Sequence, residues 1–365
     1  MDPVPLLGAM AAVTQRIGLG ATRSTTYGMP YHVAREFATL DHLSGGRAAW
    51  NVVTSMNDGE AMNFGVDSHM EHDERYDRAD EFLEVTCGLW DSWDADALVL
   101  DKAAGVYADP AKVHYLNHSG KYFKARGPLN IPRSPQGRPV IIQAGSSGRG
   151  KQLAARWAEV IFTVQPTDEL LKRFTADIRS GVAEAGRPPE SCKVLSAVMP
   201  FVGASEAEAK EKQERHNALI HPLVGLSTLS AHANVDLSGF DLDAPVSEIK
   251  SRGSQGNIAA VTRIAKDQDL SLKQIGQIYG RSVMVPQIVG TPHQIADQFC
   301  ALFEAEACNG FVLSPAFLPD TFEDFVDHVV PILQARNLVR TEYAGRTLRE
   351  NLGAQAATAS LAMTD

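Results

Sequence analysis

Residues 17–55 read IGLGATRSTTYGMPYHVAREFATLDHLSGGRAAWNVVTS, and an α/β fold class follows from this stretch. IGLGAT, which starts at Ile17, and AAWNVVTS, which ends at Ser55, are short apolar runs typical of buried strands. Between them, Tyr31–Leu43 has helical periodicity, and Gly45-Gly46 predicts the end of that helix. A strand, a helix and a second strand in this order predict two parallel strands with the helix packed outside them.

The same alternation of strands and helices continues along the rest of the chain. It predicts six core strands, near residues 19, 51, 142, 162, 197 and 312. A (β/α)₈ TIM barrel needs eight strands, whereas six strands could also form an open, doubly wound sheet. Periodicity alone does not decide between these two architectures.

Two stretches interrupt the alternation and are expected to be insertions in a single domain that spans residues 1–352. The first lies near residues 94–138 and has an irregular pattern; the second lies near residues 220–285 and begins with a segment rich in Gly, Ser, Pro and Asp. Residues 353–365, which end in AQAATASLAMTD, are expected to form a flexible tail.

The composition excludes several classes of function. The net charge of −10 disfavours nucleic acid or an anionic membrane as a partner, and no run is long and apolar enough to predict a membrane span. The four cysteines are scattered, as expected of a cytoplasmic protein. His114 and His118 have no companion at a metal-ligand spacing, so we expect no metal site.

A turn rich in small residues, QAGSSGRG at Gln143–Gly150, joins a predicted strand to a predicted helix. Free backbone N–H groups at a helix N-terminus bind anions, and the hydroxyls of Ser146 and Ser147 add donors. The turn therefore predicts a phosphate site. An ordinary tight turn between a strand and a helix would have the same composition, and the motif differs from the usual GxGxxG.

Three further features could line a ligand site. His72 and Tyr76 lie four residues apart, on one face of a predicted helix over 71–93. Asn51 interrupts a strand that should be buried, and Thr22 lies at the matching end of the preceding strand, where a barrel has its active-site mouth. Each feature also has a structural explanation: a solvated histidine beside a core tyrosine, an asparagine bonded to loop backbone, and a hydroxyl in a loop.

These segments, taken together, resemble the branch of the luciferase-like monooxygenases that contains nitrilotriacetate, dibenzothiophene-sulfone and pristinamycin-type oxidising components. The resemblance rests on residues 17–55 and, in the same order, on HDERYDRADEFLEV, RPVIIQAGSSGRG, VGTPHQIADQF and FVDHVVPILQARNLVRTEYAGRTLRENLG. It covers nearly the whole chain. It implies a (β/α)₈ barrel of the luciferase-like type rather than an open sheet.

The resemblance also implies a function. Reduced FMN from a separate NAD(P)H-dependent flavin reductase would react with O₂ to give a C4a-peroxyflavin, which oxygenates a small organic substrate. By the resemblance, the flavin-lining positions are Thr22, Asn51, His72, Tyr76, Ser146 and Ser147. The protein would supply placement and exclusion of water, while the cofactor supplies the redox chemistry.

The chain departs from the family pattern in two respects. A βαβ stretch that family members carry before the first helix is missing, so the barrel is expected to be incomplete at its N-terminus, with six of eight strands. The open edges of such a barrel would favour a homo-oligomer. The segment GRSVMVPQIVG lacks a Gly-His found in relatives, and catalytic residues stay unassigned. The alternatives are a deazaflavin-dependent oxidoreductase on the same barrel and a non-catalytic flavin-binding remnant.

Overall fold

The computed structural model describes residues 1–243, 261–266 and 268–353. Its main sheet contains seven parallel strands. Five of them follow one another in the order in which they occur in the chain, and the last two both pair with the fifth. The strands are β1 (Leu19–Ser24), β2 (Ala48–Val53), β7 (Val140–Gln143), β8 (Val160–Thr163), β9 (Lys193–Val202), β10 (Gln287–Gly290) and β11 (Gly310–Leu313).

The sheet has one strand more than the six expected from the sequence, and the extra strand is β10. Its four residues pair with Met199–Val202, the second half of β9, whereas β11 pairs with the first half at Leu195–Val198. The Val198 carbonyl accepts a hydrogen bond beside β11, and the N–H of the next residue, Met199, donates beside β10. Neighbouring residues of a strand point their backbone groups to opposite sides, so β10 and β11 pair with opposite sides of β9. β10 therefore shares the β8 side of β9 and lies beyond the end of β8. A run this short could not be distinguished from a loop by its periodicity.

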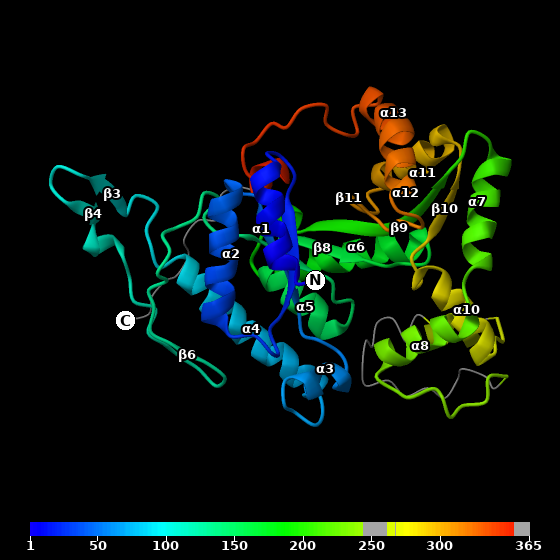
Figure 1. Ribbon diagram of the computed structural model, residues 1–365, viewed down its shortest axis with the longest axis horizontal. Helices are drawn as coiled ribbons and strands as arrows, with labels where there is room; N and C mark the ends of the chain where they lie inside the picture. Colours follow the sequence, from blue (N-terminus) through cyan, green and yellow to red (C-terminus); the bar gives the residue numbers. More distant parts are fainter. Residues whose placement is uncertain (244–260, 267, 354–365) are drawn as a thin grey trace.

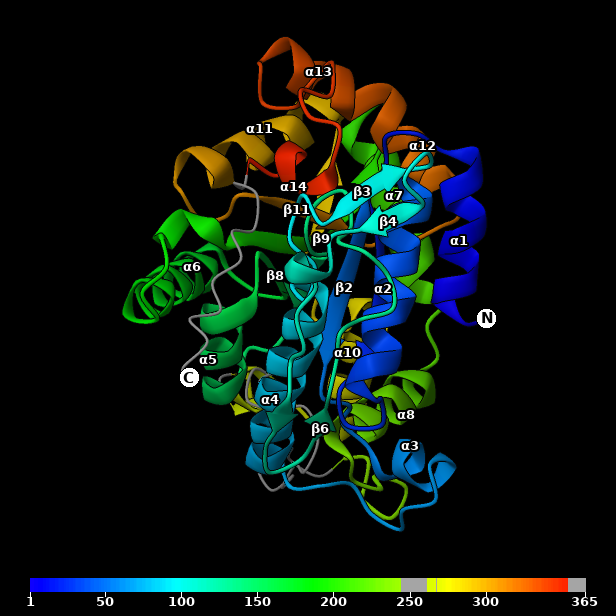
Figure 2. The same cartoon turned by 90° about the vertical axis from the view of Figure 1, so that its left-hand side faces the viewer.

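Helices cover the outer face of the sheet, as the repeated strand–helix pattern predicts. Figure 2 shows α2 and α4 in front of β2, with α5 and α6 beside them. The covering helices are α1 (Pro3–Val13), α2 (Pro30–Ser44), α4 (His72–Trp90), α5 (Gly148–Trp157), α6 (Asp168–Glu184), α7 (Glu206–Ala218), α11 (Pro292–Glu304), α12 (Asp320–Asp324) and α13 (Val330–Ala335).

The core between the helices and the strands is centred on Trp50 of β2. Its side chain is fully buried and contacts the rings of Phe37, Phe82 and Trp90, with centroids 5.8, 5.8 and 6.3 Å away. Its indole nitrogen also donates to the carbonyl of Arg23 at 3.1 Å, so no polar group is left unpaired. This packing holds α2 and α4 against the sheet and thereby positions the start of α4.

The inner face of the sheet is apolar toward the start of the strands. Ala49, Val140 and Val160 pack there with Leu348 of the short helix α14 (Leu348–Asn351). Arg349 of α14 is buried and ion-paired to Glu159 at 2.6 Å. The amino ends of the strands are therefore closed by the C-terminal segment, which leaves the carboxyl ends for a ligand. Among the described residues, no ladder of hydrogen bonds joins β1 to β11.

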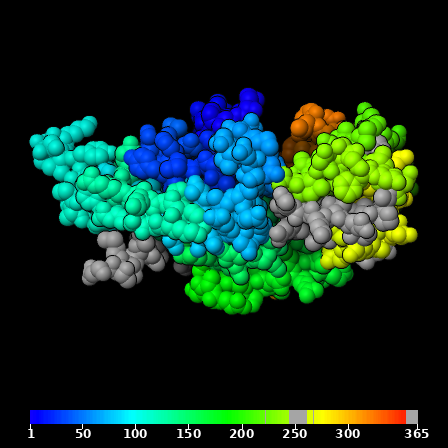
Figure 3. Space-filling view, turned by 90° about the horizontal axis from the view of Figure 1, so that it is seen from below, coloured from blue at the N-terminus to red at the C-terminus, as the bar shows by residue number. Residues whose placement is uncertain are grey.

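The first of the two stretches expected to be insertions and the described part of the second lie at opposite ends of the molecule (Figures 1 and 3). Residues 94–138 contain two small hairpins, formed by β3 (Leu98–Asp101) with β4 (Val106–Ala108) and by β5 (His118–Ser119) with β6 (Lys124–Ala125). The second stretch contains α8 (Pro222–Ala233) and α10 (Leu272–Ser282), which pack so closely that a Cβ on Gly225 would lie 1.8 Å from the carbonyl oxygen of Gly276. The single domain over 1–352 remains a prediction, and the predicted tail, apart from residue 353, lies outside the described residues.

Candidate functional site

A cavity of about 480 Å³ opens at the carboxyl ends of β1, β2, β7 and β8. This volume lies within the range of small-molecule and cofactor sites, about 300–1,000 Å³. Five of the six side chains expected from the sequence line it: Thr22, His72, Tyr76, Ser146 and Ser147. Other lining residues are Val52, Val53, Thr54, Ser55, Met56, Asn57, Glu60, Arg75, Gln143, Ala144, Gly145, Phe162, Thr163 and Val164.

The Gly/Ser turn forms one wall of the cavity, at the N-terminus of α5. Ser147 is the N-cap residue, and its hydroxyl accepts from the N–H of Gly150 at 3.0 Å. Within the described part of the chain, no hydrogen bond is formed by the hydroxyl of Ser146 or by the N–H groups of Gly148 and Arg149. Free donors at a helix N-terminus suit an anion such as a phosphate. The guanidinium of Arg149 pairs with Asp77 of α4 instead of facing the turn.

Tyr76 and the glycines of this turn pack closely. A Cβ on Gly145 would lie 2.9 Å from the Tyr76 hydroxyl and 3.0 Å from Cα of Gly150, so only glycine fits there. The side chain of Gln143 holds the turn from below by accepting from the N–H of Gly145 at 2.7 Å. The phenol of Tyr76 therefore reaches the same turn that offers the free donors.

His72 lies one helical turn before Tyr76, and the two rings face the same cavity. Their centroids are 5.0 Å apart, as the spacing of four residues predicts. The Nδ1 atom of His72 is 2.7 Å from a carboxylate oxygen of Asp73, which orients the ring at the start of α4. The imidazole is only partly buried, with 16% of its side chain exposed, so a ligand in the cavity could reach it.

Asn51 does not line the cavity directly, but it is connected to a residue that does. It is the register partner of Thr22 across β1 and β2, and its Nδ2 donates to the Thr22 hydroxyl at 2.9 Å. Its Oδ1 is buried and has no hydrogen-bond partner in the described structure. A buried carbonyl oxygen without a donor is costly to the fold.

Arg75 was not among the residues expected from the sequence. In HDERYDR it resembles any solvated basic residue at the start of a polar helix. In the structure only 3% of it is exposed, it lines the cavity, and it donates to the carbonyl of Met70. Glu60, which also lines the cavity, accepts from the hydroxyl of Ser55 at 2.7 Å. Only long-range packing reveals these two charged groups as parts of the site.

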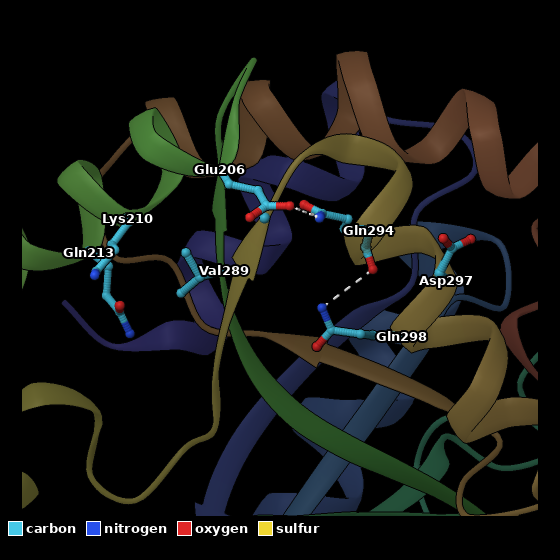
Figure 4. A pocket seen from close by; sticks show the side chains of 8 residues that line it. Glu206, Lys210, Gln213, Val289, Gln294, Asp297 and Gln298 are labelled. Carbon is cyan, nitrogen blue, oxygen red and sulfur yellow. Dashed lines mark hydrogen bonds between the residues drawn. The ribbon is translucent and has the colours of Figure 1, made fainter.

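A second pocket of about 500 Å³ lies between α7 and α11, beside β10 (Figure 4). Its polar side chains largely satisfy one another, since Gln294 donates to Glu206 and Gln298 donates to the carbonyl of Gln294 at 3.3 Å. None of the residues expected from the sequence lies there. In the described ranges no group of three or more potential metal ligands is present, and no helix is long and apolar enough to cross a membrane.

Residues 1–308 match the family model described as luciferase-like monooxygenase. A dibenzothiophene-sulfone monooxygenase of Rhodococcus erythropolis is 53% identical over 358 residues, which cover 97% of this chain and 79% of that protein. The chain belongs to the luciferase-like monooxygenase family. Component A of the nitrilotriacetate monooxygenase of Aminobacter aminovorans is 48% identical over 356 residues, with coverage of 97% and 79%.

Solved structures place this member of the luciferase-like family among flavoproteins as well. A riboflavin lyase, crystallised with modified FMN and riboflavin, superposes with a TM-score of 0.91 at 37% identity and covers 98% of this chain and 79% of its own. The chain is accordingly a flavin-dependent monooxygenase with a barrel-like fold of the luciferase type. The predictions of family, fold and enzyme class made from the sequence are confirmed.

Proposed function

We propose that this chain is the oxygenating component of a two-component monooxygenase, which uses reduced FMN and O₂ to oxygenate a small organic substrate. The cavity at the strand ends supports this best, because the free donors of the Gly/Ser turn, Tyr76 and His72 all face it. A separate NAD(P)H-dependent reductase would supply the reduced flavin. When bound, the flavin would provide O₂ activation through the C4a-peroxyflavin that the family resemblance implies.

The residues present fit FMN by their chemistry. The hydroxyls of Ser146 and Ser147 and the N–H groups of Gly148 and Arg149 would hold the phosphate. The unpartnered Oδ1 of Asn51 would accept from an N–H of the ring. His72 would orient the ring from the start of α4. These groups come from β2, α4 and α5, so their relative positions are set by the sheet rather than by one loop.

Exclusion of water is the second task of the chain, because an activated flavin decays unproductively when water and protons reach it. The loop after β2 lines the cavity with Ser55, Met56, Asn57 and Glu60 and carries α3 (Asp58–Asn63). It is fastened by a stack of Phe64 on Tyr27, with centroids 4.6 Å apart, and by a hydrogen bond from the N–H of His69 to Asp58 at 2.7 Å. Another bond, of 3.0 Å, joins the N–H of Asp58 to Asn234 of the second insertion.

The test is a fluorescence titration of the purified chain with FMN, riboflavin and a deazaflavin, followed by a coupled assay with a flavin reductase, NADH and candidate substrates. We expect FMN to bind more tightly than riboflavin, because only FMN carries the phosphate. Equal affinity for the two would contradict a phosphate site at the turn. Preferential binding of the deazaflavin would favour deazaflavin-dependent chemistry, and flavin binding without oxygenation of any substrate would favour a non-catalytic flavin-binding remnant.

A further inference from the structure

Arg75 is a buried cation without a carboxylate partner. Only 3% of the residue is exposed, and in the described structure the one hydrogen bond of its side chain goes from an Nη atom to the carbonyl of Met70. Its Nε is buried and has no hydrogen-bond partner, and no ion pair of Arg75 is present in the described ranges of the chain. A guanidinium has five N–H donors, so most of its hydrogen-bonding capacity is unused.

An unpaired charge in such a position is costly to the fold. Buried charges in proteins are normally paired and hydrogen-bonded, because taking them out of water is unfavourable. Burial also lowers the pKa of the Arg75 guanidinium from its usual value, yet an arginine keeps its proton at neutral pH. Since Arg75 lines the cavity, a ligand there can supply the missing negative charge.

Arg75 and the Gly/Ser turn belong to different sides of the cavity. Neighbouring residues of a helix point about 100° apart, and Tyr76 takes the direction toward Gly145 and Gly150. Arg75 lies on the side of Tyr27 and His69. Burial raises the pKa of Tyr27, and the charge of Arg75 opposes that rise; burial lowers the pKa of His69, and the charge of Arg75 adds to that lowering. The phosphate donors and the guanidinium therefore form two separate positive positions.

The acidic groups on that side of the cavity already have other partners. Glu60 accepts from the hydroxyl of Ser55, and Asp58 accepts from the N–H of His69. Glu71, the N-cap residue of α4, is exposed to solvent; its charge opposes the lowering of the Arg75 pKa but has less effect than burial. None of these carboxylates lies within ion-pair distance of Arg75, so they leave its charge available to a ligand.

We infer that Arg75 forms a second anion-binding point in the cavity, which receives a carboxylate or a similar oxyanion of the organic substrate. The inference rests on the proposed function, because it assigns the phosphate of the flavin to the turn and the anion of the substrate to Arg75. A planar guanidinium binds a carboxylate with two parallel hydrogen bonds. The substrate class is then a small organic acid, held by its charged end beside the loop that follows β2.

The experiment measures thermal stabilisation by succinate, a simple dicarboxylate probe, with sodium chloride at equal ionic strength as the reference. It is run on the parent, on Arg75→Met and on Arg78→Met, with saturating FMN and again without flavin. Arg78 is the matched control: it lies three residues further along α4, donates to the carbonyl of Thr25 at 3.3 Å and lies over the ring of Phe123 rather than in the cavity.

We expect succinate to raise the melting temperatures of the parent and of Arg78→Met alike in the presence of FMN. Arg75→Met should need at least roughly tenfold more succinate for the same rise in melting temperature. The affinity for FMN should be unchanged in Arg75→Met. Equal succinate responses of the parent and Arg75→Met would overturn the inference. So would a loss of FMN affinity in Arg75→Met with riboflavin affinity intact, because Arg75 would then serve the flavin phosphate.

The titration without flavin separates this inference from the proposed function. If the parent binds no FMN, the proposed function fails, but a succinate response that depends on Arg75 would still support the anion-binding point. If FMN binds and no succinate response depends on Arg75, only the second anion-binding point fails.

Discussion

Tyr76, on helix α4, holds its hydroxyl against Gly145, in the turn between β7 and α5, so closely that a Cβ on Gly145 would lie 2.9 Å from the phenolic oxygen. Tyr76 and Gly145 are 69 positions apart in the sequence, and together they form one wall of the cavity. The relationship makes the shape of the phosphate turn dependent on α4.

Replacement of Gly145 by alanine should therefore disturb the turn. The new Cβ would also lie 2.4 Å from Nε2 of Gln143 and 3.0 Å from Cα of Gly150, and overpacking of this kind costs about 1–3 kcal/mol. We expect a lower melting temperature and weaker FMN binding. Gly148→Ala is the control for stability: no atom lies within 4 Å of its added Cβ, and alanine favours a helix. Equal melting temperatures of the two variants would contradict the close packing.

Ser146 and Ser147 should separate binding from stability. The hydroxyl of Ser146 has no partner in the described structure, so Ser146→Ala should weaken FMN binding by roughly tenfold and leave the melting temperature unchanged. Ser147 caps α5 through Gly150, so Ser147→Ala should also lose about 1 kcal/mol of stability. Fluorescence titration and thermal denaturation measure the two effects. Parent-like FMN affinity in both variants would remove the phosphate site from this turn.

His72 should matter for the fate of oxygen rather than for folding. Its ring is partly exposed, and among the described residues the ring has one hydrogen-bond partner, the neighbouring Asp73. We expect His72→Ala to melt near the temperature of the parent and to release more H₂O₂ per NADH consumed in the assay coupled to a flavin reductase. A variant that binds FMN and couples oxygen to substrate as well as the parent does would show that His72 is only a surface residue.

Replacement of Asn51 should change the stability of the fold and the affinity for FMN in different directions. Its Oδ1 is buried without a donor, so replacement by the similarly sized leucine removes an unsatisfied polar group. The Thr22 hydroxyl, which loses its bond to Asn51, is exposed and can bond to water instead. Asn51→Leu should keep or raise the melting temperature while weakening FMN binding about tenfold. Unchanged FMN affinity would show that the amide does not face the flavin.

Glu81 should make the stability of the chain depend on pH. Burial raises the pKa of its carboxyl, but hydrogen bonds from the N–H groups of Tyr122 and Phe123 and from His118 outweigh burial and lower it below the ordinary value of 4.5. The folded state thus binds this proton less readily than the unfolded state, so the stabilisation is complete above about pH 4.5 and is lost as the pH falls through the lowered pKa.

The comparison for Glu81 is with Glu81→Gln, measured by thermal denaturation at several pH values. The amide keeps the shape but not the charge, so the variant should melt below the parent at neutral pH. The difference should narrow as the medium becomes acidic. A difference that stays constant down to the acid unfolding of the parent would mean that the ionised carboxylate is not the stabilising species.

Local patterns of the sequence were sufficient for the parallel α/β fold, for the strand-to-helix turn at Ser146 and Ser147, and for the shared face of His72 and Tyr76. Each depends on neighbours a few positions away: the alternation of short apolar runs and helices, a cap before a helix, and a spacing of four residues. The position of α4 beside the turn was not accessible in this way, because it results from packing around Trp50.

The tertiary structure alone decided the rest of the site. Arg75 and His72 occupy the same polar stretch of sequence, yet Arg75 is buried, with its guanidinium against the carbonyl of Met70, and His72 is partly exposed. The short strand β10 exists because β9 is long enough to pair with two strands in succession. The burial of a side chain and the pairing of a strand both depend on contacts with residues far away in the sequence. The cavity and the unpaired charge of Arg75 therefore form only when these distant segments pack together in the folded chain.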